Sequence, residues 1–282
     1  MNTYLEALRR IRDEGELRED RTGTGTLSLF GLQMEFDLAD GFPIVTTKKL
    51  YMHGIKTELC WFLRGDTHVE YLQDRNVHIW DAWAGATECG RFGREEGDLG
   101  PIYGHQWRNF GASFDEEKGV YRQDGVDQIK RALDLLRNNP SSRRILVTGW
   151  NPKEADQVSL PPCHTLFQLY VHVDGRLSCQ LYQRSADFFL GVPFNICSYS
   201  LLVHMLCAMT GLKPGRFVHT FGDAHIYTNH LEQVKEQLSR EPLPLPQLEI
   251  TRVPDLIEEW RPRDIRLKGY EFYSAIKAPV AV

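Results

Sequence analysis

The sequence predicts an α+β fold, built as a single domain over residues 1–282 around a long buried helix. Strand-like and helical patterns follow one another without the regular strand–helix–strand repeat of a parallel α/β protein. Residues 193–211 are apolar on nearly every side, which indicates a central helix inside the core. No internal repeat, low-complexity tract or Pro/Ser-rich linker divides the sequence, and this favours one domain.

The N-terminal elements follow from the periodicity of apolar residues. A helix is expected over residues 3–13, where apolar side chains form one stripe. The Gly/Thr-rich stretch 20–25 predicts a turn, and the alternation of apolar and polar residues over 32–37 predicts a strand. Helical patterns recur over 55–63 and 126–137.

A β-hairpin is predicted in the second half of the chain. Strand patterns over 166–173 and 176–183 flank Asp174-Gly175, a dipeptide typical of a type I′ turn. The apolar helix that follows has proline early and glycine just past its end, the usual asymmetry of helix termini.

The remaining segments are read in the same way. Strands are expected at 217–220 and 248–251, with a polar helix over 228–240 between them. Residues 85–100 are charged and glycine-rich, which predicts a surface loop.

Composition and charge narrow the functional classes. A net charge of −5 gives no support to a broad nucleic-acid or membrane-binding face, so a few local cations must hold any bound phosphate. The first 16 residues are charged throughout and lack the apolar run of a signal peptide. No stretch approaches the roughly eighteen uninterrupted apolar residues of a membrane span. A cytoplasmic protein is therefore expected.

Six cysteines occur without a CxxC pair, so neither a metal site nor a redox dithiol is expected. Cys163 has the context of a nucleophile, because two prolines precede it and a strand pattern follows. A buried structural cysteine is the commoner alternative, and it is the expected role of Cys179, Cys197 and Cys207.

Arg184 ends a strand pattern beside Ser185 and Asp187. A guanidinium at a strand end can bind a phosphate bidentately, and the neighbouring hydroxyl adds a donor. A surface salt bridge between Arg184 and Asp187 is the commoner alternative. Arg21 lies in the Gly/Thr-rich turn, which could bind phosphate but lacks the spacing of a dinucleotide fingerprint or P-loop.

Two further candidates have strong structural alternatives. Arg143 and Arg144 lead into a strand pattern, so they should point to opposite faces, and solvent exposure of both is the default. Asn195 lies near the start of the apolar helix, where a capping role competes with a binding role.

Three polar residues complete the candidates. His225 and Tyr227 would lie on one face of an extended segment as binding groups, or be satisfied core residues. Glu58 directly precedes an apolar run. A carboxylate in that setting has a raised pKa and can act as a general acid or base, with a partly exposed helix glutamate as the alternative.

In this order the motifs resemble the thymidylate synthase family over residues 4–282. They are Asp20-Arg21-Thr22-Gly23-Thr24-Gly25-Thr26, Trp80-Asp81-x-Trp83, Gly97-Asp98-Leu99-Gly100-Pro101-x-Tyr103-Gly104, Ser142-Arg143-Arg144, Pro162-Cys163-His164, Gln180-Leu181-Tyr182-Gln183-Arg184-Ser185, Phe189-Leu190-Gly191-Val192-Pro193-Phe194-Asn195 and Gly222-Asp223-x-His225-x-Tyr227.

The resemblance implies a mixed sheet surrounded by helices and the reductive methylation of deoxyuridylate (dUMP) to thymidylate (dTMP). The co-substrate would be 5,10-methylenetetrahydrofolate, the donor of carbon and hydride. Cys163 would add to C6 of the uracil ring, with its pKa lowered by Arg184. Glu58 would manage protons through ordered water. The implied catalytic residues are Cys163, Glu58, Arg184, Asn195 and Tyr103.

The ligand-binding residues are implied in the same way. Those for dUMP are Arg21, Arg143, Arg144, Arg184, Ser185, Asp187, Asn195, His225 and Tyr227. The two adjacent arginines would come from the other subunit of a homodimer. Those for the folate are Trp80, Trp83, Asp187, Gly191, Phe194 and Val282. The apolar tail 278–282 would close over the site and exclude water.

Asn195 is implied to select the base. Its amide can donate to O4 of uracil and accept from N3–H, whereas cytosine reverses both polarities. Related cytidylate hydroxymethylases carry aspartate there, so a uracil substrate is expected.

Alternatives stay open. A dUMP hydroxymethylase would share the nucleophile and the folate but let water capture the methylene group, from which Trp80 would shield it. An RNA-binding regulator gains no support from the charge, so no nucleic-acid or membrane partner is expected. An inactive homologue is disfavoured, because every expected catalytic position is filled. Residues 270–274 lack the Pro-His-Pro sequence that is common in the family. This difference bears on how the tail closes over the folate.

Overall fold

A mixed β-sheet forms the centre of the computed structural model, which describes residues 1–115 and 117–280. Among these residues six strands pair in the order β1-β2-β8-β7-β6-β5. β7 and β8 run parallel, whereas the other neighbours are antiparallel. The strands are β1 (Glu16–Arg18), β2 (Thr26–Asp37), β5 (Leu146–Thr148), β6 (His164–Val171), β7 (Arg176–Asp187) and β8 (Lys213–Tyr227). The predicted α+β class with a mixed sheet is confirmed.

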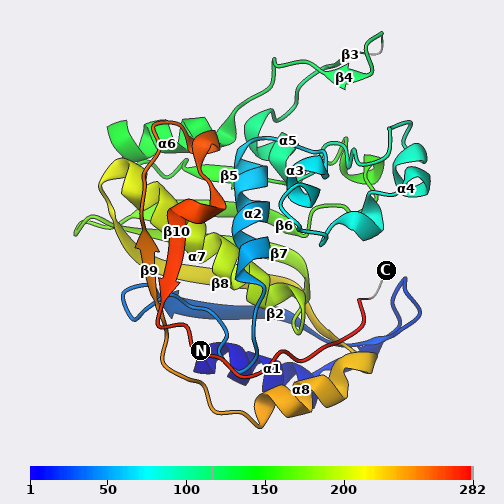
Figure 1. Cartoon of the computed structure of the whole chain (residues 1–282), viewed down its shortest axis with the longest axis vertical. Helices are drawn as coiled ribbons and strands as arrows, with labels where there is room; N and C mark the ends of the chain where they lie inside the picture. Colours follow the sequence, from blue (N-terminus) through cyan, green and yellow to red (C-terminus); the bar gives the residue numbers. More distant parts are fainter. Residues whose placement is uncertain (116, 281–282) are drawn as a thin grey trace.

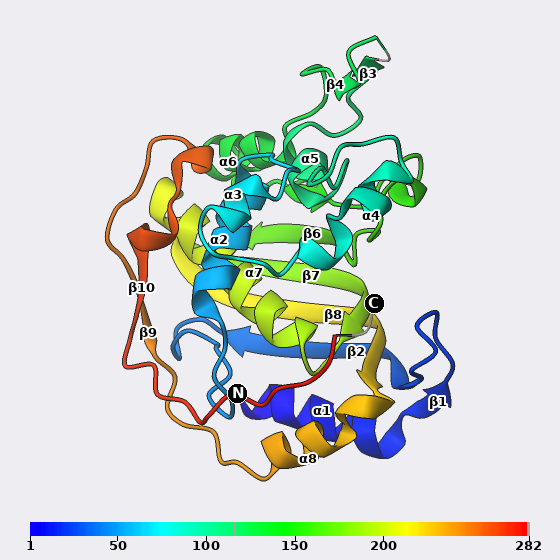
Figure 2. The ribbon, with the colours of Figure 1, turned by 45° about the vertical axis from the view of Figure 1, so that its right-hand side comes forward.

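Helices cover one face and one edge of the sheet (Figure 1). α7 (Gly191–Thr210) packs on β7 and β8, and α2 (Met52–Leu63) packs on α7. α1 (Asn2–Glu14) and α8 (Leu231–Leu238) lie together beside β2 (Figure 2). The shorter helices are α3 (Glu70–Gln73), α4 (Ala86–Gly90), α5 (Tyr103–Arg108), α6 (Gln128–Asn138), η1 (Asp81–Trp83), η2 (Ala155–Gln157), η3 (Thr228–His230), η4 (Ile257–Glu259) and η5 (Pro262–Asp264).

α7 is the predicted central helix. Gly211 ends it in the left-handed conformation (φ 75°), and its N–H bonds to the Cys207 carbonyl, as a C-terminal glycine cap does. By length and composition α7 could cross a membrane, but 78% of its apolar window is buried inside the protein. It is therefore a core helix, and it brings the residues at its N-terminal end to the edge of the sheet.

The predicted N-terminal elements are confirmed, with shifted ends. The apolar stripe of α1 is buried in the core: Tyr4, Leu5, Leu8 and Ile11. In β2 the buried residues alternate with exposed ones as expected: Leu32, Met34 and Phe36. β2 begins earlier than predicted, because it pairs with β8 along its whole length. The polar helix expected over 228–240 consists of η3 and α8.

The hairpin between β6 and β7 is confirmed, but its predicted type I′ turn is wrong. Gly175 has φ 79°, whereas Asp174 is not among the described residues with positive φ, as a type I′ turn would require. The Gly175 N–H bonds to the His172 carbonyl, and the His172 N–H bonds to the Arg176 carbonyl. This is a three-residue loop with glycine in the left-handed position.

Two smaller pairings lie outside the main sheet. β9 (Gln247–Ile250) pairs with β10 (Ile265–Lys268), which confirms the strand expected near 248–251. β3 (Phe114–Asp115) pairs with β4 (Val120–Tyr121) in a hairpin that projects from the body (Figures 1 and 2).

The surface loop predicted over 85–100 is wrong in part. This segment contains α4, and both Cys89 and Leu99 are buried. Most of the glycines and charges that suggested a loop lie between these two buried residues, so the segment is exposed only in places.

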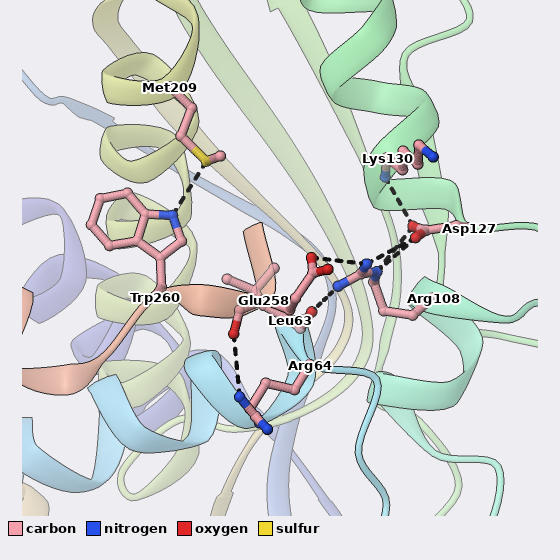
Figure 3. Close-up of polar contacts among 8 residues, drawn as sticks. All are labelled: Leu63, Arg64, Arg108, Asp127, Lys130, Met209, Glu258 and Trp260. Carbon is pink, nitrogen blue, oxygen red and sulfur yellow. Dashed lines mark hydrogen bonds and ion pairs between the residues drawn. The ribbon is translucent and has the colours of Figure 1, made fainter. Parts of the chain in front are cut away.

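Arg108 holds the C-terminal end of α2 in place. Its guanidinium pairs with Asp127 at 2.9 Å and with Glu258 at 3.2 Å, and it donates to the Leu63 carbonyl (Figure 3). Asp127 also caps α6 by accepting from the Lys130 N–H. This network ties α2, α5, α6 and η4 together, and α2 carries Glu58.

The face of the sheet that points away from α7 is only half covered. Phe217 faces α7, because its ring stacks on Tyr199 at 6.1 Å, and it is fully buried. Residues of the opposite parity, such as Gln180 and Thr220, stay exposed or half-buried and bond to one another over 3.1 Å. This face is thus partly open on the single chain, and it also carries the exposed side chains of Leu146 and Tyr170.

Candidate active site

Cys163 lies directly before β6 and is the only half-buried cysteine of the six; the others are fully buried. Its backbone N–H donates to the Tyr103 hydroxyl over 2.7 Å, and its carbonyl accepts from the Arg184 N–H over 3.0 Å. These bonds fix the backbone on both sides of the thiol. The expected burial of Cys179, Cys197 and Cys207 is confirmed, whereas Cys163 is only half-buried.

The pKa of the Cys163 thiol differs from the expectation. Burial raises its pKa above the usual value, while Arg184 and Arg21 act in the opposite direction. The Arg184 guanidinium lies 4.0 Å from Sγ. The expected lowering of this pKa is therefore wrong for the free single chain, because desolvation by the surrounding residues outweighs the two cations.

Arg184 is held by the loop that carries the cysteine. It donates to the carbonyls of Pro162 at 2.9 Å and Pro161 at 3.0 Å. Asp187 instead accepts from the backbone N–H groups of Phe189 and Leu190, both at 3.0 Å. The salt bridge that was the commoner alternative for Arg184 and Asp187 does not form between these two described residues. Ser185, next to Arg184, is half-buried at the same strand end.

Asn195 lies inside α7, one turn after its start, so the capping alternative is wrong. Its Nδ2 lies 2.8 Å from Nε2 of His164. Burial lowers the pKa of His164 to about 4, so the ring is neutral, and its Nε2 accepts from the amide. Sequence reasoning did not single out His164, although it stands in the Pro162-Cys163-His164 motif.

Tyr103 links the cysteine to the histidine. Its ring packs 4.8 Å from the His164 ring and 4.9 Å from the Phe62 ring. Burial raises its pKa, so its hydroxyl keeps its proton. Tyr103 thus joins α5, the loop before β6 and α2 at one point.

Glu58 has the raised pKa that the sequence predicted. Burial raises it to about 7, and a hydrogen bond from the Trp80 indole, 2.7 Å long, acts against that rise. Trp80 is buried, and the half-buried Trp83 packs against it with ring centres 5.8 Å apart. A carboxyl group that exchanges its proton near neutral pH thus lies beside the Trp80 indole, against which Trp83 packs.

The Gly/Thr-rich turn brings Arg21 toward the same region. Asp20 organises the turn by accepting from the backbone N–H groups of Thr22 and Gly25 at 3.1 and 2.8 Å. The Arg21 side chain is exposed, and its charge acts on both Cys163 and Tyr227.

His225 and Tyr227 lie at the end of β8, with ring centres 5.3 Å apart. His225 is buried and bonds to Asp223 at 3.0 Å through Nδ1. Tyr227 is half-buried, and the charges of Asp187 and Cys163 both act on its hydroxyl. The structure therefore brings the end of β8 close to the cysteine and the start of α7.

Arg143 and Arg144 are both exposed just before β5. The cations that act on Cys163 within this chain are Arg184 and Arg21. The two adjacent arginines are the predicted site residues that this single chain leaves outside the cluster.

The start of α7 supplies the other expected folate residues. Gly191 is the first residue of the helix, and the half-buried Phe194 packs against the core. Asp187 accepts both its bonds through Oδ1. The half-buried aromatic surfaces of Trp83 and Phe194, with the carboxylate of Asp187 between strand and helix, suit a planar ring system with N–H donors. Val282 lies outside the described residues.

Lys48 is a buried cation that sequence reasoning missed. Its Nζ donates to the Phe189 carbonyl over 2.6 Å and lies 3.4 Å from the centre of the Phe189 ring. Burial lowers its pKa to about 7, while Asp187 acts in the opposite direction. No periodic pattern of apolar residues distinguishes Lys48 in the sequence. Its position becomes evident only from its contact with Phe189, which lies 141 residues away.

Among the described residues, no group of three or more His, Cys, Asp or Glu side chains is arranged to hold a metal ion. The functional groups brought together are a thiol, an amide, a titrating carboxyl and several cations, near the ends of the strands β6, β7 and β8 and the start of α7. In a comparison with known families, the model of the family described as thymidylate synthase matches residues 2–282.

Proposed function

The chain belongs to the thymidylate synthase family, a methyltransferase that converts dUMP to dTMP, and we propose that the residues gathered around Cys163 carry out this reaction. When bound, 5,10-methylenetetrahydrofolate supplies the carbon and the hydride. The observation that carries the assignment of residues is the meeting of Cys163, Arg184 and the Asn195–His164 pair at one edge of the sheet.

Cys163 is the nucleophile. Its thiolate adds to C6 of the uracil ring, which makes C5 nucleophilic, and its later departure restores the ring double bond. Because burial raises the thiol pKa, the proton must be lost against desolvation. Arg184 and Arg21 lower this cost, and two further cations from a partner subunit would lower it more.

Asn195 selects uracil. One Nδ2 hydrogen bonds to His164, which leaves the other for O4 of the base and leaves Oδ1 to accept from N3–H. The neutral His164 holds the amide in this orientation through the tautomer in which the Nε2 lone pair accepts from Nδ2. Cytosine would place its amino group opposite the amide N–H, so that two donors would face each other. Such a mismatch weakens binding by roughly 10⁴-fold or more.

Glu58 moves protons. A carboxyl group with a pKa of about 7 is populated in both states at neutral pH, which suits a residue that takes up and returns protons. We infer that it acts on the reacting ring through ordered water, and that Trp80 fixes its orientation. The hydroxyl of Tyr103 holds the backbone of the nucleophile.

The nucleotide is held at its two ends. Arg21, Arg184 and Ser185 bind the phosphate, with His225 and Tyr227 on the ribose hydroxyl. Arg143 and Arg144 reach the phosphate of a second copy in a homodimer, which the partly open sheet face and the exposure of both side chains support. Asp187 contacts both dUMP and the folate, at the point where the two ligands meet.

The folate lies beside Trp80, Trp83, Gly191 and Phe194, with Asp187 as acceptor for its ring N–H groups. The C-terminal tail, with Val282 at its end, closes over it and excludes water. We expect the enzyme in the cytoplasm.

The test is a covalent trap. 5-Fluoro-dUMP carries fluorine at C5, which cannot leave as a proton does, so its adduct with the enzyme and methylenetetrahydrofolate should persist. We expect mass spectrometry to find one adduct on the peptide that contains Cys163, and none in folded Cys163→Ser. An adduct on another cysteine, or normal turnover of Cys163→Ser, would overturn the assignment.

A further inference from the structure

The C-terminal segment lies along the body of the protein below the start of α7 (Figure 2). The Tyr273 N–H donates to the Thr46 carbonyl over 3.0 Å, and Arg240 donates to the Ser274 carbonyl over 2.8 Å. Arg240 also donates to the Thr47 carbonyl over 2.7 Å, so one side chain bonds to both of the adjacent segments. These bonds fix the segment to the body of the protein.

The last contact of the described tail is made by His230. Its Nε2 lies 2.7 Å from the carbonyl oxygen of Pro279. A carbonyl oxygen can only accept, so Nε2 carries the hydrogen. Nδ1 has no hydrogen-bond partner within the described part of the chain.

His230 is fully buried between Tyr227, a residue of the proposed dUMP site, and Phe189, which precedes the proposed folate residues of α7. Its ring packs 5.6 Å from the Tyr227 ring and 5.5 Å from the Phe189 ring. Phe189 in turn lies over Lys48 and leads directly into α7. The imidazole therefore connects the tail to the end of β8 and to the turn before the folate-binding residues.

We propose that His230 is a positioning residue for closure of the active site: its Nε2–H fixes the Pro279 carbonyl and so directs the chain end over the bound folate. The proposal rests on the proposed role of the tail as a cover for the folate. His230 touches neither substrate in this scheme and acts only through the tail.

The surroundings of the two partners explain why the bond governs closure rather than folding. Pro279 is exposed, so water can satisfy its carbonyl when the tail lifts away. The ring of His230, by contrast, is fully buried against Tyr227 and Phe189. Loss of the donor should thus shift the balance toward the open tail by about tenfold, the usual net effect of one such bond.

The test compares two substitutions of His230 with a matched control. His230→Phe keeps an aromatic ring in place but removes the donor, and His230→Gln keeps a donor at nearly the same distance from the backbone. His53→Phe is the control, because Nε2 of His53 also lies 2.8 Å from a carbonyl, that of Arg75, but on the exposed face of α2 away from the tail.

The readouts are the KM for methylenetetrahydrofolate, the Kd for dUMP and the rate at which carboxypeptidase digests the tail in the complex with dUMP and a non-reactive folate analogue. For His230→Phe we expect a folate KM raised about tenfold, faster digestion and a dUMP Kd within about twofold of wild type. His230→Gln should recover most of the loss, and His53→Phe should match wild type.

An unchanged folate KM and digestion rate in His230→Phe would overturn the proposal. Equal weakening of both ligands together with a lower Tm would also overturn it, because that result means a purely structural residue. If wild type forms no dTMP, the proposed site fails instead, whereas the digestion rate of the wild-type and variant tails still reports on the bond itself.

Discussion

The Trp80 indole donates to the Glu58 carboxylate over 2.7 Å, and this bond joins the proposed proton carrier to a proposed folate-binding ring. The bond favours the ionised form, yet burial still raises the pKa to about 7. A change in the folate pocket that moves Trp80 would therefore change the charge of Glu58.

Glu58→Gln should alter the pH dependence of stability. The folded pKa of Glu58 is raised from 4.5 to about 7, so its stabilising effect is full below pH 4.5 and is lost as pH rises through 7. The variant has no carboxyl group at this position, so its stability does not fall in this way as the pH rises. We expect its free energy of unfolding, relative to wild type, to increase by up to ~3 kcal/mol between pH 4.5 and 8. Urea unfolding at several pH values measures it, and a pH-independent difference would contradict the raised pKa.

Asn195→Asp should move substrate preference from dUMP toward deoxycytidylate. The carboxylate has no N–H for O4 of uracil or for Nε2 of His164, so His164 must present Nε2–H instead. We expect the ratio of kcat/KM for the two nucleotides to change by at least ~10²-fold, as buried mismatches do. Unchanged relative rates would remove Asn195 from base recognition.

Mixed subunits should test the role of Arg143 and Arg144. If each phosphate site takes these residues from the other copy, Cys163→Ser and Arg144→Ala subunits form hybrids with one intact site. Random exchange of two inactive proteins should then restore about a quarter of wild-type activity, because half the dimers are hybrids and each has one of two sites intact. No recovery after verified exchange would show that the arginines serve their own chain.

Arg108→Ala should destabilise the fold. The side chain is 14% exposed, and its removal leaves Asp127 and Glu258 without their shared cation. Both carboxylates are partly solvated, so we expect a loss of about 2 kcal/mol, below the usual cost of breaking a buried pair. Lys130→Ala is the control, since this exposed side chain lies beside the same network and should cost less than ~0.5 kcal/mol. Equal losses in the two variants would contradict the role of Arg108.

Apolar periodicity predicted the elements well, because it records which faces are buried. α1 and α7 follow from it, as does the burial alternation in β2. The turn at Asp174 could not be predicted reliably, since two backbone hydrogen bonds decide its type. Periodicity therefore predicts elements more reliably than the details of their connections.

Ordered motifs in the sequence mark the residues of the proposed site, but they predict its electrostatics only in part. The raised pKa of Glu58 could be predicted from the adjacent apolar run. The raised pKa of Cys163 could not, since it depends on how the whole site packs around the thiol. His164 and Lys48 were missed because their partners lie 31 and 141 residues away in the sequence.

The most direct test of the central claim is a stoichiometric assay of the purified protein with dUMP and methylenetetrahydrofolate, in which both products are identified by mass. We predict dTMP and dihydrofolate in equal amounts, with no product from Cys163→Ser. Hydroxymethyl-dUMP with tetrahydrofolate would contradict the account, since it would mean that water, and not hydride, reaches the transferred carbon.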